Sequence, residues 1–355
     1  MKLLASALLL ALATPASAAF QIDSLTATHP SGSRYRFPLL RDTSPAAQKI
    51  NLWLQGMELH KLPGRYRTAA FEDIWPPADS EQGVTALDYS VISNAPGYLS
   101  IGFAGEYMGA YPSQNTYSYT FDAASGTPID LGDLFTPQGL QALRADAVAQ
   151  RVKRIEAFLA GQQVEQGVQL RTDDTETADE QRALYTDCLP FIRDDDLNYN
   201  DLQLGSERLT LVRELCAPHV AQAIDDLGEY RNSWRYQDLR EQLSDYGRCL
   251  LLERRSDCRR PDARVAGAFR GTLGGRYPIT LVIRRRIASD ALEAGYFYDK
   301  HATFIELSGE QKADGSLILS EDGPPAARFV LHLDGGSLKG TWQQDGKAPQ
   351  AVELH

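Results

Sequence analysis

The chain of 355 residues carries 47 acidic and 36 basic residues, for a net charge of −11 at neutral pH. It holds no basic tract, which argues against a protein that binds nucleic acid or anionic lipid through its charge. A surplus of acids suits a cationic partner, although solubility alone also accounts for it. Residues 264–355 hold 11 basic and 11 acidic side chains, so the surplus lies in residues 20–263.

The first 19 residues are organised like a signal peptide. Lys2 is a short positive region, residues 3–13 are mostly apolar, and residues 15–19 are small enough for cleavage. The apolar run is shorter than the about 20 residues that a membrane span needs, and no second run of that length follows. We expect a mature protein that is periplasmic or secreted and does not span a membrane. A retained anchor is the alternative.

A helix and two strands are predicted next. Ser44 and Pro45 form a helix start, an N-cap followed by the first helical position, and apolar residues at helical spacing continue to Leu59. Residues 86–94 and 98–108 alternate apolar and polar side chains, which is typical of half-buried strands.

The run from Gly109 to Phe135 has the strongest pattern in the chain. Tyr117, Tyr119 and Phe121 alternate, so their rings share one face of an extended segment. A turn follows at residues 122–126, and the alternation then resumes before a helix. We therefore predict a hairpin that runs into a helix.

The tyrosines in and beside this hairpin form a candidate recognition surface. By alternation, half of them face the core and half are exposed, and exposed tyrosine supplies contact area at low entropic cost. Packing in the core or along a sheet edge is the alternative. The candidate binding residues are Tyr107, Tyr111, Pro112, Tyr117 and Tyr119.

A second helix should begin at Thr136 and Pro137 and end at Gly161. The acidic residues 172–181 predict a loop or a short helix start. The core-facing stripe of the second helix comprises Leu140, Leu143, Ala147, Val152, Ile155 and Leu159.

The later segments complete an α+β domain, an antiparallel sheet with packed helices. Residues 201–215 predict a hairpin and residues 234–247 a last helix. The charged segment 254–267, which contains Pro261, is the expected domain boundary.

Residues 264–355 predict a small all-β sandwich or barrel, because Gly-rich turns recur about every 8–12 residues and no helical period is present. The expected organisation is a signal peptide (1–19), an α+β domain (20–255) and this β module (264–355).

Four cysteines, Cys188, Cys216, Cys249 and Cys258, predict two disulfides in an exported protein. Three connectivities are possible. We favour Cys188 with Cys216, which joins two segments expected to flank strands, and Cys249 with Cys258, which closes a short loop. Zinc is disfavoured because no two cysteines are three positions apart.

Asp194, Asp196 and Asn198 occupy the first, third and fifth positions of a calcium loop. Tyr199 stands where that loop needs glycine, and Gly205 stands where it needs a bidentate glutamate. A solvated acidic turn is the better interpretation. We expect no metal and no cofactor.

No residue set in the sequence points to catalysis. His219 lies close to Cys216, but an exported chain with an even number of cysteines makes Cys216 a disulfide partner first. Acidic pairs are too abundant in this composition to mark a site.

Part of the chain resembles a known family. The matching positions are Asn94, Ser100, Gly109, Ala110, Phe121, Asp122, Gly126, Leu131, Asp133, Leu134 and Phe135. Together they resemble the extracytoplasmic family of unknown function found in lysozyme-sensing anti-sigma factors and in front of some polysaccharide deacetylases. Downstream, Ala217, Pro218, Tyr236 and Leu239 match the closing strand and helix of that family.

The resemblance covers residues 20–250 and implies an α+β domain that binds protein. Two features depart from the family pattern. Tyr111 and Pro112 stand where the family has a His-containing loop, and the transmembrane helix of an anti-sigma factor is absent from the sequence. The β module loosely resembles small β modules of exported bacterial proteins, which implies no function.

We therefore expect an exported, non-enzymatic binding protein of the cell envelope. Its partner would be a basic protein such as a lysozyme, or a wall glycan. The alternative is a periplasmic hydrolase or carbohydrate-active enzyme that acts on cell-wall glycan.

Overall fold

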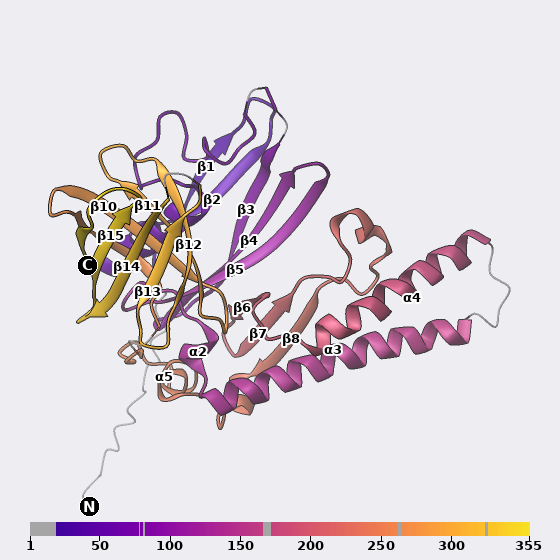
Figure 1. The fold of residues 1–355 in the computed structure, drawn as a ribbon. Helices are drawn as coiled ribbons and strands as arrows, with labels where there is room; N and C mark the ends of the chain where they lie inside the picture. Colours follow the sequence, from indigo (N-terminus) through magenta and orange to yellow (C-terminus); the bar gives the residue numbers. More distant parts are fainter. Residues whose placement is uncertain (1–18, 78, 81, 166–171, 262–263, 324–325) are drawn as a thin grey trace, which may run out of the picture.

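The computed structural model describes residues 19–355 except residues 78, 81, 166–171, 262–263 and 324–325. The predicted signal peptide lies almost wholly outside the described residues. Within them, no helix is long and apolar enough to cross a membrane. The chain forms an α+β part followed by a closed antiparallel barrel (Figure 1), which confirms the predicted fold class.

The α+β part is built on a five-stranded sheet whose strands follow chain order. Neighbouring strands are antiparallel except β2 and β3, which are parallel and meet at one residue pair. The two predicted strands are confirmed as β3 and β4. The strands are β1 (Ile22–Thr28), β2 (Arg34–Leu40), β3 (Gly83–Asn94), β4 (Tyr98–Met108) and β5 (Pro112–Asp122).

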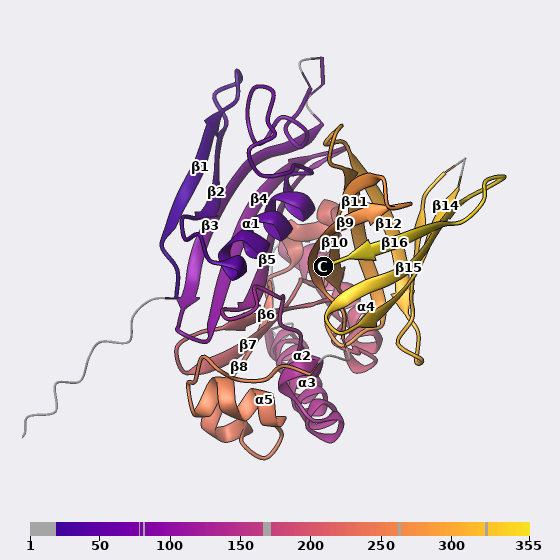
Figure 2. The ribbon, with the colours of Figure 1, turned by 90° about the vertical axis from the view of Figure 1, so that its left-hand side faces the viewer.

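Helix α1 (Pro45–Glu58) lies between this sheet and the barrel (Figure 2). It begins as predicted, with the Ser44 side chain accepting a hydrogen bond from the Ala47 amide. Trp53 is fully buried, and its indole N–H donates to the carbonyl of Ile283 in the barrel at 2.8 Å. Side chains from the sheet, α1 and the barrel form one hydrophobic cluster.

The predicted hairpin is corrected, because only its first arm is a strand. After the turn at residues 122–126, the chain makes a single bridge to β5, between Phe121 and Pro128. It then enters helix α2 (Leu131–Leu134), which Asp130 caps through its side chain. Strand pairing ends there because Asp130, two residues after Pro128, is the N-cap of α2. The aromatic face of β5 is confirmed, since its rings pack on the shared cluster.

Helices α3 (Pro137–Glu165) and α4 (Thr172–Arg193) form an arm that projects from the body (Figure 1). The predicted start of α3 is confirmed, because the Thr136 hydroxyl accepts a hydrogen bond from the backbone amide of Gly139 at 3.0 Å. Gly161 does not end α3: it keeps a negative φ, and the helix continues through it. The acidic segment 172–181 begins a full helix.

A second sheet joins β6 (Asn200–Leu204), β7 (Arg208–Arg213) and β8 (Tyr230–Arg235), and the predicted hairpin is its first two strands. The predicted last helix is wrong. Its first residues belong to β8, and Leu243 forms a bridge with Phe135 that interrupts the helical course. Short helical turns take up the rest of this region: η1 (His219–Ile224), η2 (Tyr236–Leu239), α5 (Asp245–Gly247) and η3 (Arg248–Leu252).

The C-terminal strands close into an eight-stranded antiparallel barrel, because β9 pairs with both β10 and β16. This closure selects the barrel over the sandwich. Strand β10 is buried on both faces, since one face fills the barrel and Val282 on the other packs in the cluster around α1. The strands are β9 (Gly267–Leu273), β10 (Tyr277–Arg285), β11 (Ala291–Tyr298), β12 (Phe304–Gln311), β13 (Leu317–Glu321), β14 (Ala327–Asp334), β15 (Ser337–Gln344) and β16 (Gln350–Leu354).

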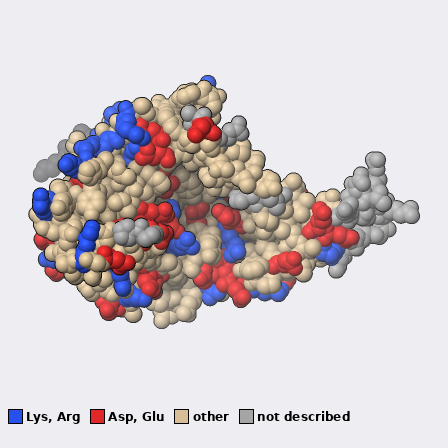
Figure 3. Space-filling view, turned by 45° about the horizontal axis from the view of Figure 1, so that its top comes forward, with Lys and Arg blue, Asp and Glu red and all other residues tan. Residues whose placement is uncertain are grey.

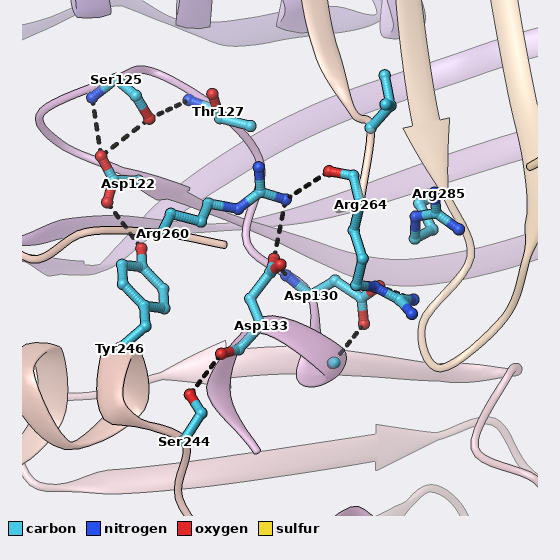
Figure 4. A network of polar contacts seen from close by, with 12 residues as sticks. Asp122, Ser125, Thr127, Asp130, Asp133, Ser244, Tyr246, Arg260, Arg264 and Arg285 are labelled. Carbon is cyan, nitrogen blue, oxygen red and sulfur yellow. Dashed lines mark hydrogen bonds and ion pairs between the residues drawn. The ribbon is translucent and has the colours of Figure 1, made fainter. Parts of the chain in front are cut away.

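Residues around α2 bind the segment between η3 and β9, which leads into the barrel and is here called the linker (Figure 4). Asp130 and Asp133 cap α2 reciprocally. Each also binds a linker arginine: Asp130 pairs with Arg264 at 2.5 Å, and Asp133 pairs with Arg260 at 3.0 Å. Burial raises the pKa of Asp133, and Arg260 opposes that shift. Asp133, which belongs to the family-like pattern, therefore stabilises both the start of α2 and the linker.

Both disulfides have the favoured connectivity, Cys188 with Cys216 and Cys249 with Cys258. One part of the prediction was wrong, because Cys188 lies within α4 and not beside a strand. The first bridge therefore ties the arm to the loop after β7. Disulfides persist in oxidising compartments, which suggests export.

Candidate binding cleft

A cleft of about 420 Å³ opens where β5 and β6 meet the barrel strands β10 and β11. Figure 3 shows the molecule hollowed between the barrel and the arm, with acidic and basic side chains in the hollow. Of the predicted binding residues, Tyr117 and Tyr119 lie in this cleft. Its lining comprises Glu58, Asn115, Thr116, Tyr117, Tyr119, Asn198, Tyr199, Asn200, Asp201, Glu214, Arg284, Arg285, Arg286 and Glu293.

Tyr117 and Tyr119 are held edge to face, with ring centroids 5.6 Å apart. The Tyr119 hydroxyl donates to Oε1 of Glu58 at 2.6 Å. Burial raises the pKa of both tyrosines well above the usual value, and the negative charge of Glu58 adds to the shift. Both phenols therefore stay protonated at neutral pH.

Arg284 connects α1, β5 and β11 across the cleft. Its guanidinium donates to the Tyr119 hydroxyl at 2.5 Å, lies 3.5 Å from Glu58 and forms an ion pair with Glu293. Burial alone would raise the pKa of Glu293, but Arg284 and Arg286 lower it. These charges are thus compensated within the protein. The three consecutive arginines from Arg284 were a visible signal in the sequence, whereas their partners come from distant segments.

Asp201 is the acidic side chain in the cleft whose ionisation is most displaced. Burial raises its pKa to about 7, and the nearby carboxylates of Glu214 and Glu229 add to the rise, against a backbone hydrogen bond at Ser118. Asp201 can therefore gain or lose a proton in the neutral range. Sequence reasoning missed it, because one Asp at the start of a strand looks like an ordinary exposed position.

The other predicted binding residues lie at the far end of the β4–β5 hairpin, outside the cleft. The exposed fractions are 46% for Tyr107 and 64% for Tyr111, and Pro112 is also exposed. Strand pairing places Pro112 opposite Met108, at the tip. The predicted surface therefore divides into an exposed tip and a recessed aromatic floor.

The calcium-loop residues form a turn held by its own side chains. The backbone amide of Asn198 donates to Oδ1 of Asp196 at 3.1 Å. Among the described residues, no three His, Cys, Asp or Glu side chains gather as metal ligands. Asp195, which is not part of the calcium-loop pattern, is buried, whereas Asp194 and Asp196 on either side of it are exposed.

A buried polar network lies beneath the cleft and anchors the arm. Arg151 of α3 donates to Asp195 at 2.5 Å and to Asn200 and Asn232 at 2.6 Å each. Arg213 binds the same Asp195 carboxylate at 2.6 Å. Burial lowers the pKa of Arg151 to about 10, which still leaves it charged. An available signal was that Asn200 and Asn232 occupy inward positions of their strands.

No protein-family model matches the sequence, and no curated protein matches it. Solved structures with a similar outline include two DUF3298 family proteins. One is a member of the DUF3298 family from Bacteroides fragilis, with 11% identity, a TM-score of 0.40 and coverage of 68% of this chain and all of that one.

The other is a DUF3298 family protein from Pseudomonas aeruginosa, with 13% identity, a TM-score of 0.37 and coverage of 63% of this chain and 94% of that one. Neither is described as an anti-sigma factor or a deacetylase, so that part of the resemblance stays a prediction. No functional assignment rests on these similarities.

Proposed function

We propose that this is an exported cell-envelope protein that binds a wall glycan in the cleft between β5, β6 and the barrel. The observation that carries the proposal is that aromatic rings lie beside charges that are already compensated. A cleft of this kind suits a neutral polar ligand, because no strong net charge selects an ion.

The side chains match the surfaces of a sugar. Tyr117, Tyr119 and Tyr199 supply aromatic area for the apolar C–H face of a sugar ring. The amides of Asn115 and Asn198 can both donate to and accept from hydroxyl groups. The cleft volume also falls in the usual range for ligand sites, about 300–1,000 Å³.

Calorimetry of the mature protein with a chitin tetrasaccharide tests the proposal. Tyr199 lines the cleft and is exposed, so Tyr199→Ala should weaken binding by about tenfold without unfolding the protein. Tyr111→Ala is the matched control, because Tyr111 is similarly exposed but lies outside the cleft. Equal affinities of both variants and the wild type would place the glycan elsewhere.

Hydrolysis of wall glycan is a second candidate, favoured by the raised pKa of Asp201. A carboxyl group that stays protonated near neutral pH can act as a general acid, and Glu214 supplies a second carboxylate in the cleft. Asp201→Asn should then abolish the release of reducing ends from cell-wall glycan and leave binding intact. No release by the wild-type protein would discard this candidate.

A basic protein such as a lysozyme is a further proposed partner, on a different surface. Tyr107, Tyr111 and Pro112 are exposed together at the hairpin tip, and the acidic excess of the chain favours a cationic protein. Tyr199→Ala and Tyr111→Ala separate the two partners, since each should weaken only one.

A further inference from the structure

The two ends of the barrel differ. At one end Val265 of the linker packs into the barrel core, and its amide donates to the Gln311 side chain at 3.2 Å. At the other end a cavity of about 450 Å³ opens. We call this end the barrel mouth. Its lining comprises Leu273, Tyr277, Tyr296, Tyr298, His301, Ile305, Glu321, Trp342, Gln344, Lys347 and Gln350.

Aromatic rings dominate the barrel mouth. The ring centroid of Tyr298 lies 6.4 Å from that of Tyr277 and 5.5 Å from that of Tyr296. Tyr277 is 43% exposed, whereas Tyr296 and Trp342 are buried. The aromatic lining therefore extends from the surface into the barrel. The interior of an eight-stranded barrel has room for at most one small ligand, so a ligand at this end would be small.

Polar groups accompany these rings. The Tyr296 hydroxyl donates to Oε1 of Glu321 at 2.6 Å, which orients that carboxylate at the cavity. The buried indole N–H of Trp342 has no hydrogen-bond partner within the described part of the chain. Gln344 adds an amide, and the charges of Glu321 and Lys347 have opposite sign.

We propose that the barrel mouth binds one neutral sugar ring, so that the β module is a glycan-binding unit in its own right. The tyrosine rings would cover the apolar face of the sugar, and Glu321 and Gln344 would take its hydroxyl groups. The barrel mouth shares no lining residue with the cleft between β5, β6 and the barrel. A sugar can therefore bind at the barrel mouth whether or not one binds in that cleft.

The four tryptophans allow one experiment to separate the two sites. Trp342 lines the barrel mouth, whereas the Trp53 ring lies 4.8 Å from Tyr119 of the cleft. The full mature chain is labelled with 5-fluorotryptophan, and its fluorine NMR signals are followed during titration with diacetylchitobiose and, separately, with maltose. Trp342→Phe assigns the signal of interest.

We expect at least one sugar to shift the Trp342 signal in a saturable manner, with or without a change at Trp53. Tyr277→Ala should weaken that response by about tenfold or more. Phe191→Ala should leave it unchanged, because Phe191 is an exposed ring of α4 that lies outside the barrel mouth. The other tryptophan signals verify that each variant is folded, and Gln344→Ala replaces Tyr277→Ala if it is not.

Three results would overturn the inference. The first is a Trp342 signal that neither sugar moves at about 10 mM, well above a millimolar dissociation constant. The second is a shift that survives both mouth variants. The third is a shift caused by the apolar dye anilinonaphthalene sulfonate and by neither sugar, which would make the barrel mouth a lipophilic site.

Discussion

Arg151 and Asp195 are both buried where the α3–α4 arm meets the second sheet. Removing one member of such a pair leaves buried polar groups without their partners, which typically costs about 3–5 kcal/mol. We expect Arg151→Met to lower the free energy of unfolding by about that amount, measured by urea denaturation. Arg193→Met is the matched control, because Arg193 pairs with Glu156 across the same arm in an exposed position, where a pair is worth about 0–1 kcal/mol. Equal losses in the two variants would contradict the buried network.

Asp201 should make stability depend on pH. Its pKa of about 7 in the folded protein lies above that of an unfolded aspartate, so the folded state binds more protons between about pH 4 and pH 7. Stability from this group is therefore lost as the pH rises through that window, by at most about 4 kcal/mol. Asp201→Asn cannot ionise and should be more stable than the wild type at pH 8.

The measurement for Asp201 is urea denaturation of both proteins at pH 4 and pH 8. The difference between wild type and variant should be larger at pH 8. Parallel pH profiles would show that Asp201 titrates normally.

The disulfide of the arm should contribute more to stability than the disulfide near the linker. Cys188 and Cys216 are 28 residues apart, and Cys249 and Cys258 are 9 apart. A bridge that closes a longer loop removes more entropy from the unfolded chain, and such bridges are typically worth about 2–4 kcal/mol. Replacing Cys188 and Cys216 together by Ala should therefore cost about 1 kcal/mol more than replacing the other pair. Reversed losses in thermal or urea unfolding would contradict the loop argument.

The β4–β5 hairpin tip offers a separate test of protein binding. Tyr111→Ala should cost more than about 1 kcal/mol of affinity for a lysozyme, as expected for an aromatic anchor. The stability of the protein should hardly change, because Tyr111 is 64% exposed. Calorimetry at two salt concentrations checks both points, since charges interact over about 10 Å at 0.1 M salt and less above it. Absence of binding at both salt concentrations would remove lysozyme as a partner.

Residues 264–355 should fold without the rest of the chain. Their strands close on themselves, and a cluster of apolar side chains fills the barrel. The isolated module would expose Val282 and Phe297, which are fully buried against the cluster around α1 in the whole protein. We therefore expect a dispersed β-type NMR spectrum together with some self-association. An unfolded fragment would mean that α1 is part of the barrel's core.

Local signals were enough for the fold class and for several elements. The Ser44–Pro45 helix start, strands β3 and β4 and the turn-rich β module all follow from neighbouring residues, and the structure confirms them. Sequence reasoning failed where a distant contact decides the conformation. The predicted last helix gave way to a bridge between Phe135 and Leu243, which no local pattern reveals.

The sequence by itself determined the acidic character of the chain, its α+β and all-β parts and the aromatic face of β5, and it favoured one of three possible cysteine pairings. Only the tertiary structure brought Glu58, Tyr119, Arg284 and Glu293 together, and only barrel closure created a mouth at one end. The physical reason is that burial of one face of a helix or strand places apolar residues at a regular spacing in the sequence, so the spacing reveals which face is buried. A site instead depends on single side chains that meet across segments far apart in the chain, and such meetings leave no period to read.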